Sequence, residues 1–186
     1  MKPMLMLLGA AKIALGGVAS AAEVDVGAPV TAENAAAVME LTRIADAIDA
    51  AVDAKDWTTA RRLFAENVAV DFTGLVGGEP ATISSDALVG GWASNLTEAK
   101  TSFHMRTNHR VRFDGPGKAR MVSNGYAWNR LADGAQPANG GDDLWEVWGT
   151  YTHGFLLTES GWRVDAMSFS PTHQRGNVYV RDTIVE

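Results

Sequence analysis

The fold is decided where a long helix ends and the first strand begins, in the stretch AVDAKDWTTARRLFAENVAVDF of residues 51–72. Asp56 predicts a helix start at Trp57, because a carboxylate at this position accepts hydrogen bonds from the free N–H groups of the first helical turn. Residues 68–73 then have the composition of a short strand. The few residues before Asp56 predict that the short helix packs as a hairpin against the helix that precedes it.

That preceding helix is the most strongly periodic element of the sequence. From Thr31 to Asp53, apolar side chains recur three and four residues apart in one stripe: Val38, Leu41, Ile44, Ile48 and Val52. A glycine-rich loop follows the strand and leads to a third predicted helix, which opens at Ser85 or Asp86. Three helices are therefore predicted in the first half of the chain.

The second half reads as a series of strands joined mostly by turns. The predicted strands are Thr101 to Phe113, Lys118 to Arg130, Leu144 to Thr158 and Trp162 to Phe169. Short turns join antiparallel neighbours, so these strands predict a meander. Helices followed by a meander indicate an α+β fold in which a curved sheet packs its apolar face on the helices.

The composition describes one acidic domain. The chain has 186 residues, of which 46% are apolar and 20% charged, and its formal net charge is -6. The length fits about one domain, and the negative charge argues against a nucleic-acid partner. The sequence has no cysteine, no recognisable metal-ligand spacing and none of the common cofactor or nucleophile motifs. We therefore expect neither a metal nor a cofactor.

Residues 1–21 have the pattern of an export signal. A positively charged start is followed by a mostly apolar run over 4–15 and by the small-residue cleavage pattern ASA at 19–21. The run is too short for a helix across a bilayer, which needs ~20 residues, so we expect no stable membrane insertion. We expect a periplasmic or secreted protein with a linker at 22–30; the alternative is an alanine-rich start of a cytoplasmic protein.

Four segments carry a family resemblance: AVDAKDW at 51–57, LFAENVAVDF at 63–72, TSFHMRTNH at 101–109 and GWRV at 161–164. They resemble the SnoaL-like proteins of the nuclear-transport-factor-2-like superfamily. The resemblance implies a cone-shaped α+β fold, with three N-terminal helices packed on a strongly curved antiparallel sheet. We assign residues 31–170 to this domain and residues 171–186 to a C-terminal tail.

The resemblance also implies a catalytic pair. Scytalone dehydratase and bile-acid dehydratase, two members of that superfamily, pair an Asp near the end of the first helix with a His on the first long strand, and the matching residues here are Asp53 and His104. A carboxylate bonded to one ring nitrogen fixes the tautomer and stabilises the imidazolium that forms after proton abstraction. Asp71 is the second choice of base, because strand alternation points it away from the cavity if Phe72 faces inward.

Strand alternation constrains His104. It shares the polar face of its strand with Arg106, while Phe103 and Met105 lie on the other face. A pocket histidine faces inward, so we expect either a bulge in this strand or a polar face that lines the cavity at this end. Arg106, Arg110 and Arg112 are most simply interpreted as a solvated strand face.

The tyrosines that polarise the substrate carbonyl in scytalone dehydratase align with Val52 and Phe72, so that device is missing here. We expect substrate-binding residues from several elements: Phe72, Trp92, Tyr126, Asn129, Tyr151 and His153. Replacements for the missing tyrosines come from Tyr126, Asn129 or Tyr151 in this hypothesis. His153 has a second interpretation, as a core histidine with its hydrogen bonds satisfied.

The resemblance implies a cofactor-independent acid/base enzyme, a dehydratase or isomerase that acts on a small hydrophobic or polycyclic molecule. Two alternatives stay open: a non-catalytic module that binds a small ligand, and a structural oligomerisation domain of the same fold. A cavity filled by side chains such as Trp128 and Phe155 would indicate the structural alternative. We expect a homo-oligomer, a dimer or a trimer.

Overall fold

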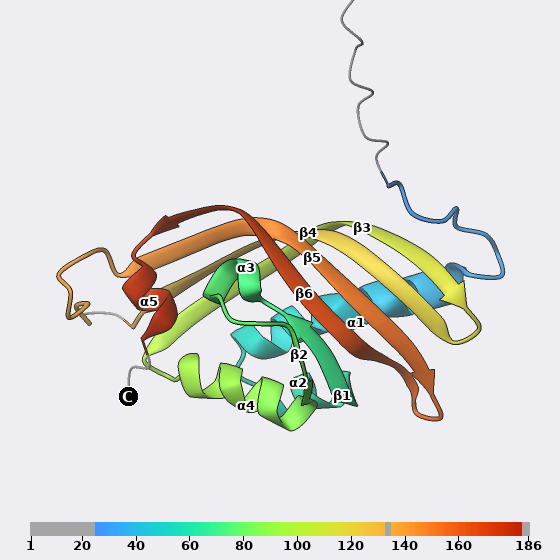
Figure 1. The fold of residues 1–186 in the computed structure, drawn as a ribbon, viewed down its shortest axis with the longest axis horizontal. Helices are drawn as coiled ribbons and strands as arrows, with labels where there is room; N and C mark the ends of the chain where they lie inside the picture. The colour runs from blue at the N-terminus through green and yellow to red at the C-terminus, as the bar shows by residue number, and fades with distance from the viewer. Residues whose placement is uncertain (1–24, 133–134, 184–186) are drawn as a thin grey trace, which may run out of the picture.

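Helices form the first half of the chain and long strands the second, as the sequence predicts (Figure 1). The computed structural model describes residues 25–132 and 135–183, so the expected export signal at 1–21 lies outside the described residues. The elements follow in this order: α1 (Ala35–Asp53), α2 (Trp57–Arg62), β1 (Phe64–Asp71), α3 (Thr73–Val76), β2 (Ala81–Ser84), α4 (Ser85–Asn95), β3 (Lys100–Gly115), β4 (Lys118–Leu131), β5 (Leu144–Thr158), β6 (Gly161–Gly176) and α5 (Val178–Asp182).

The predicted helix starts follow from side-chain capping. The Asp56 carboxylate accepts a hydrogen bond from the backbone N–H of Thr59 at 3.0 Å and starts α2. The Ser84 hydroxyl accepts one from the N–H of Ala87 at 3.1 Å and starts α4. Each cap satisfies a backbone donor that the first helical turn leaves unpaired.

The six strands form one curved sheet in the order β2-β1-β6-β5-β4-β3. The pairs β3–β4, β4–β5 and β5–β6 are antiparallel, as expected for strands joined by turns, and β1 pairs with β6 in parallel. That pairing joins distant parts of the chain, and local sequence patterns do not predict it. Strand β2 also escaped prediction, because its four residues follow a glycine-rich loop.

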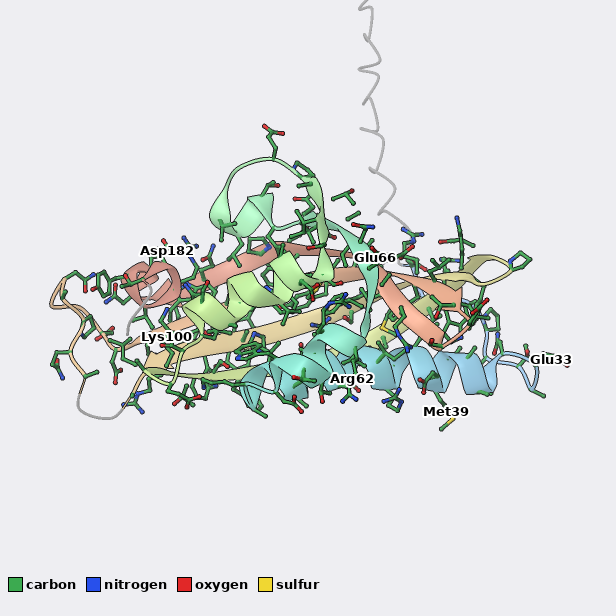
Figure 2. The ribbon with its side chains drawn as sticks, turned by 90° about the horizontal axis from the view of Figure 1, so that it is seen from below. Glu33, Met39, Arg62, Glu66, Lys100 and Asp182 are labelled. Atoms are coloured by element: carbon green, nitrogen blue, oxygen red, sulfur yellow. The ribbon has the colours of Figure 1, made fainter. Side chains whose placement is uncertain are left out.

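The helices α1, α2 and α4 lie beneath the arch of the strands (Figure 1), and Figure 2 shows them from the helix side, in front of the sheet. The predicted stripe of α1 faces the sheet: Leu41, Ile44 and Ile48 are at most 1% exposed. The helices and the concave face of the sheet thus share one hydrophobic core.

A bulge in β3 reverses which side chains face the core. The pairing of β3 with β4 shifts between Thr107 and Arg110, and Asn108 has the left-handed φ of 55°. Before the bulge the even-numbered residues of β3 face inward, as buried Ser102 shows, and after it Val111 is buried. The polar face that carries His104 is therefore an inner face, which resolves the conflict between alternation and a pocket histidine.

The expected C-terminal tail is structured over residues 171–182. Strand β6 continues to Gly176, and α5 follows at one end of the sheet (Figure 1). Val180 is fully buried, so α5 packs against the rest of the molecule. The sequence pattern missed this helix because five residues are too few to show a helical period.

Ile44→Ala tests the core face of α1. The substitution leaves a cavity around a side chain that is 1% exposed, and we expect it to lower the free energy of unfolding by about 2–5 kcal/mol. Met39 lies on the same helix but is 73% exposed, so Met39→Ala is the matched control, with an expected change within about 0.5 kcal/mol. Urea titration followed by circular dichroism measures both; equal losses would contradict this placement of the helix.

Candidate active site

A cavity of about 450 Å³ lies between the helices and the concave face of the sheet. Its wall is mostly apolar and includes four of the residues expected to bind substrate: Phe72, Trp92, Asn129 and Tyr151. His104 also lines it. The space is open and is not filled by Trp128 or Phe155, neither of which lines it.

Asp53 and His104 are in direct contact. The Nδ1 atom of His104 lies 2.7 Å from Oδ1 of Asp53, and the backbone N–H of His104 donates to Oδ2 at 2.7 Å. The Ser102 hydroxyl donates to Oδ1 at 2.9 Å. Three groups of β3 therefore hold the carboxylate at the end of α1, and its lone pairs favour the tautomer in which Nδ1 carries the proton.

This environment keeps Asp53 ionised. Partial burial by itself raises the pKa of the carboxyl, but the hydrogen bonds and charge of His104, with the Ser102 hydroxyl, outweigh it and lower the pKa below its usual value. The side chains of Asp53 and His104 are each about one fifth exposed, at 20% and 18%. Both side chains are thus largely shielded by the protein, and His104 is the member of the pair that lines the cavity.

A second polar group lies beside the pair. The guanidinium of Arg106 donates from Nε to Oδ2 of Asp49 at 2.6 Å and from Nη2 to Oδ1 at 2.5 Å. Its Nη1 lies 2.5 Å from Nε2 of His153. The Arg106 side chain is 1% exposed, so the expectation of a solvated arginine was wrong for this residue. Arg106 lies on the inner face of β3, where water does not solvate its charge. The two hydrogen bonds to the Asp49 carboxylate offset the cost of burying that charge.

His153 belongs to this second group and not to the cavity wall. It is fully buried, and burial together with the Arg106 charge lowers its pKa well below the usual value. It is therefore a neutral acceptor for Arg106. The interpretation as a satisfied core histidine fits, and the expectation that His153 contacts substrate does not.

Tyr151 lies with its ring against Arg106. The guanidinium carbon is 4.0 Å from the ring centroid, a cation–π contact. Burial raises the pKa of the Tyr151 hydroxyl to about 12, so it keeps its proton at neutral pH. The ring occupies space that a side chain at Gly125 would fill, because a Cβ there would lie 2.3 Å from Cε2 of Tyr151.

Tyr126 lies on the outer face of the sheet. Even-numbered residues of β4 alternate outward, while Ala127 and Asn129 face the cavity. The Tyr126 hydroxyl donates to Glu146 at 2.6 Å on that outer face. Tyr126 therefore does not line the cavity beside His104, because it has the opposite strand parity from Asn129.

Asp71, the second candidate base, is engaged elsewhere. Its carboxylate accepts hydrogen bonds from the hydroxyl of Thr73 at 2.7 Å and from the backbone N–H of Thr73 at 3.1 Å. These bonds lower its pKa. It is bound to the first residue of α3 and is not among the residues that line the cavity beside His104.

The sequence analysis missed Asp49 as a site residue, although a signal was present. Asp49 precedes Asp53 by four residues, one helical turn, and each follows an apolar residue of the buried stripe, Ile48 or Val52. Two acids at this spacing on the edge of a buried stripe indicate that an element packed against the helix supplies their partners.

In residues 25–132 and 135–183, no group of three or more His, Cys, Asp or Glu side chains is arranged to hold a metal ion. No helix in this described part of the chain is long and apolar enough to cross a membrane.

Solved structures share the fold at low sequence identity. The Kfla4162 protein of Kribbella flavida is 23% identical, with a TM-score of 0.69 over 80% of this chain and 97% of that one. A proposed scytalone dehydratase of Novosphingobium aromaticivorans is 16% identical, with a TM-score of 0.65 over 79% and 92%. The hexachlorocyclohexane dehydrochlorinase LinA-type3 of Novosphingobium barchaimii is 11% identical, with a TM-score of 0.61 over 78% and 92%.

These likenesses confirm the expected α+β fold, in which a curved sheet packs on its helices. A comparison with curated proteins found no match. The family model of the SnoaL-like domain matches residues 33–168, well over half of the chain. Together with the curved sheet over its helices and the cavity between them, this match shows that the chain belongs to the SnoaL-like domain family.

Proposed function

We propose that this protein is a cofactor-independent acid/base enzyme of the dehydratase or isomerase type, acting on a small hydrophobic molecule. The observation that carries the proposal is the 2.7 Å contact of Asp53 with Nδ1 of His104, a residue that lines the cavity. That distance is within the range of a strong hydrogen bond between a base and the group that orients it.

The contact defines what each nitrogen of His104 does. Nδ1 donates its proton to Asp53, so Nε2 carries the free lone pair. No described residue hydrogen-bonds Nε2, which leaves it available to a bound molecule. When Nε2 takes a proton, the negative Asp53 stabilises the resulting imidazolium.

The proposed dehydration has two balanced steps. Nε2 of His104 removes a proton from the carbon beside a carbonyl, and the electron pair of that C–H bond moves into an enolate. The enolate then forms the new carbon–carbon double bond as the neighbouring C–O bond breaks, and His104 returns its proton to the departing hydroxyl, which leaves as water. Without a leaving group, the proton returns to another carbon and the reaction is an isomerisation.

Two further observations support this chemistry. The wall of the cavity is largely apolar, which suits a hydrophobic molecule. The names of two proteins of the same fold, a proposed scytalone dehydratase and a dehydrochlorinase, both describe eliminations, in which a proton and a leaving group depart.

His104→Ala and Asp53→Asn test the catalytic pair. The measurement is the absorbance of the unsaturated carbonyl product, over a panel of small hydrophobic hydroxyketones. For any substrate that the wild type converts, we expect each substitution to lower kcat/KM by about 10²–10⁴-fold, the usual contribution of a positioned acid/base. His173→Ala, on the exposed face of the sheet, is the control and keeps full activity.

Activity within a few-fold of wild type in either variant would overturn the catalytic pair. The rival function, a non-catalytic binding module, predicts instead that neither substitution affects the affinity for an apolar ligand and that the wild type converts nothing in the panel.

The lowered pKa of Asp53 predicts a pH dependence of stability. Because the pKa is lower in the folded than in the unfolded chain, the ionised carboxylate stabilises the fold above its unfolded pKa of about 3.9, and this stabilisation is lost as the pH falls through the folded pKa. Asn has no such titration. We expect the free energy of unfolding to fall less steeply in Asp53→Asn than in the wild type below about pH 4, measured by urea titration at several pH values; parallel curves would contradict the shift.

A further inference from the structure

The charged side chains of the cavity wall are neutralised by one another. Arg106 is bound to Asp49, and Arg181 donates to the neighbouring Asp182 at 2.5 Å. All four line the cavity. An anionic ligand would therefore meet arginines whose charge is already balanced by carboxylates. This pairing favours an uncharged ligand.

Three neutral polar groups in the same wall have no hydrogen bond to a described residue: the indole N–H of Trp145, the hydroxyl of Tyr151 and the side-chain amide of Asn129. Tyr151 and Asn129 are each only 8% exposed. Buried polar groups in folded proteins are normally hydrogen-bonded, and an unmade hydrogen bond is costly. A ligand with a hydrogen-bonding atom could therefore supply the missing partner of the Tyr151 hydroxyl or of the Asn129 amide.

The strand register places Asn129 and Tyr151 on either side of His104. Asn129 pairs with Ser102, and His104 pairs with Ala127 in the next inward-facing row. Arg106 pairs with Gly125 in the row after that. The Tyr151 ring extends over Gly125 and against Arg106, so it borders the row of His104 on the side opposite Asn129.

Tyr151 is held by its surroundings. The missing side chain of Gly125 makes room for the ring. The Arg106 guanidinium packs on the ring and is itself fixed by two hydrogen bonds to Asp49. The hydroxyl stays protonated at neutral pH, so it is a donor to an acceptor oxygen.

We propose that the Tyr151 hydroxyl, held by Arg106 and the gap at Gly125, donates a hydrogen bond to the carbonyl oxygen of an uncharged ligand beside His104, with the Asn129 amide as a second polar contact. This deepens the proposed function and rests on it for the reaction: a donor at the carbonyl oxygen stabilises the negative charge that appears there when the adjacent proton leaves. Arg106 is a positioning residue in this arrangement.

Binding of three probes with related ring skeletons tests the proposal without any turnover. The probes are 1-indanone, which carries a carbonyl oxygen, indane, which carries none, and indane-1-carboxylate, which is anionic. Titration calorimetry gives the dissociation constants. In the wild type, we expect 1-indanone to bind more tightly than indane-1-carboxylate.

Tyr151→Phe removes only the hydroxyl. We expect it to raise the dissociation constant of 1-indanone about tenfold, the effect of one lost hydrogen bond, and to leave that of indane within twofold. Asn129→Leu is expected to raise the dissociation constant of 1-indanone by a smaller factor. Tyr126→Phe is the matched control, because its hydroxyl lies on the outer face of the sheet, and it changes neither constant.

Gly125→Ala tests the positioning of the ring separately. A Cβ at this site would displace the Tyr151 ring, although the hydroxyl is still present. We therefore expect Gly125→Ala to raise the dissociation constant of 1-indanone about as much as Tyr151→Phe does. Gly90→Ala in α4 is the control glycine, since a Cβ there meets no atom within 4 Å.

Equal effects of Tyr151→Phe on 1-indanone and indane would overturn the proposal, as would tightest binding of indane-1-carboxylate. These outcomes are independent of catalysis. If His104→Ala leaves turnover intact but Tyr151→Phe still weakens 1-indanone selectively, the proposed reaction fails and the carbonyl subsite stands.

Discussion

The carboxylate of Asp53 is the point on which the site depends. It lies at the end of α1 and accepts hydrogen bonds from the hydroxyl of Ser102 and from both the backbone and the ring of His104. These hydrogen bonds fix the end of α1 opposite Ser102 and His104 of β3. The same bonds that hold the helix on the sheet also fix the orientation of the imidazole, so the contact that stabilises the fold is also the contact on which the proposed acid/base role rests.

The cavity separates two kinds of polar group. Its ionised side chains are matched with one another, as Arg106 is with Asp49, and their mutual attraction offsets part of the cost of burial. Two of its neutral groups, Tyr151 and Asn129, keep their hydrogen-bonding capacity for a ligand. In a wall that is otherwise largely apolar, this division suits an uncharged molecule with a polar atom, and it gives the buried arginine a role in holding Tyr151.

The starts of α2 and α4 were predictable because helix caps are local. The contact of Asp53 with His104 followed from the family resemblance, and Asn129 and Tyr151 were expected to bind substrate. Tyr126 was grouped with Asn129 against strand parity: the two residues are an odd number apart, so they lie on opposite faces of β4. Arg106 was misread as solvated because the sequence alone does not say which face of a polar strand is inside.

By itself, the sequence determined the order and type of most elements, the buried stripe of α1 and the acidic, cysteine-free composition, since each depends on residues close together in the chain. Only the tertiary structure decided the rest. The parallel pairing of β1 with β6, the bulge at Asn108 and the meeting of Asp49 with Arg106 all join residues whose partners are chosen by packing. The sequence pattern does not reveal these pairings, because the energy of a buried polar side chain depends on the groups around it, which are distant in the chain.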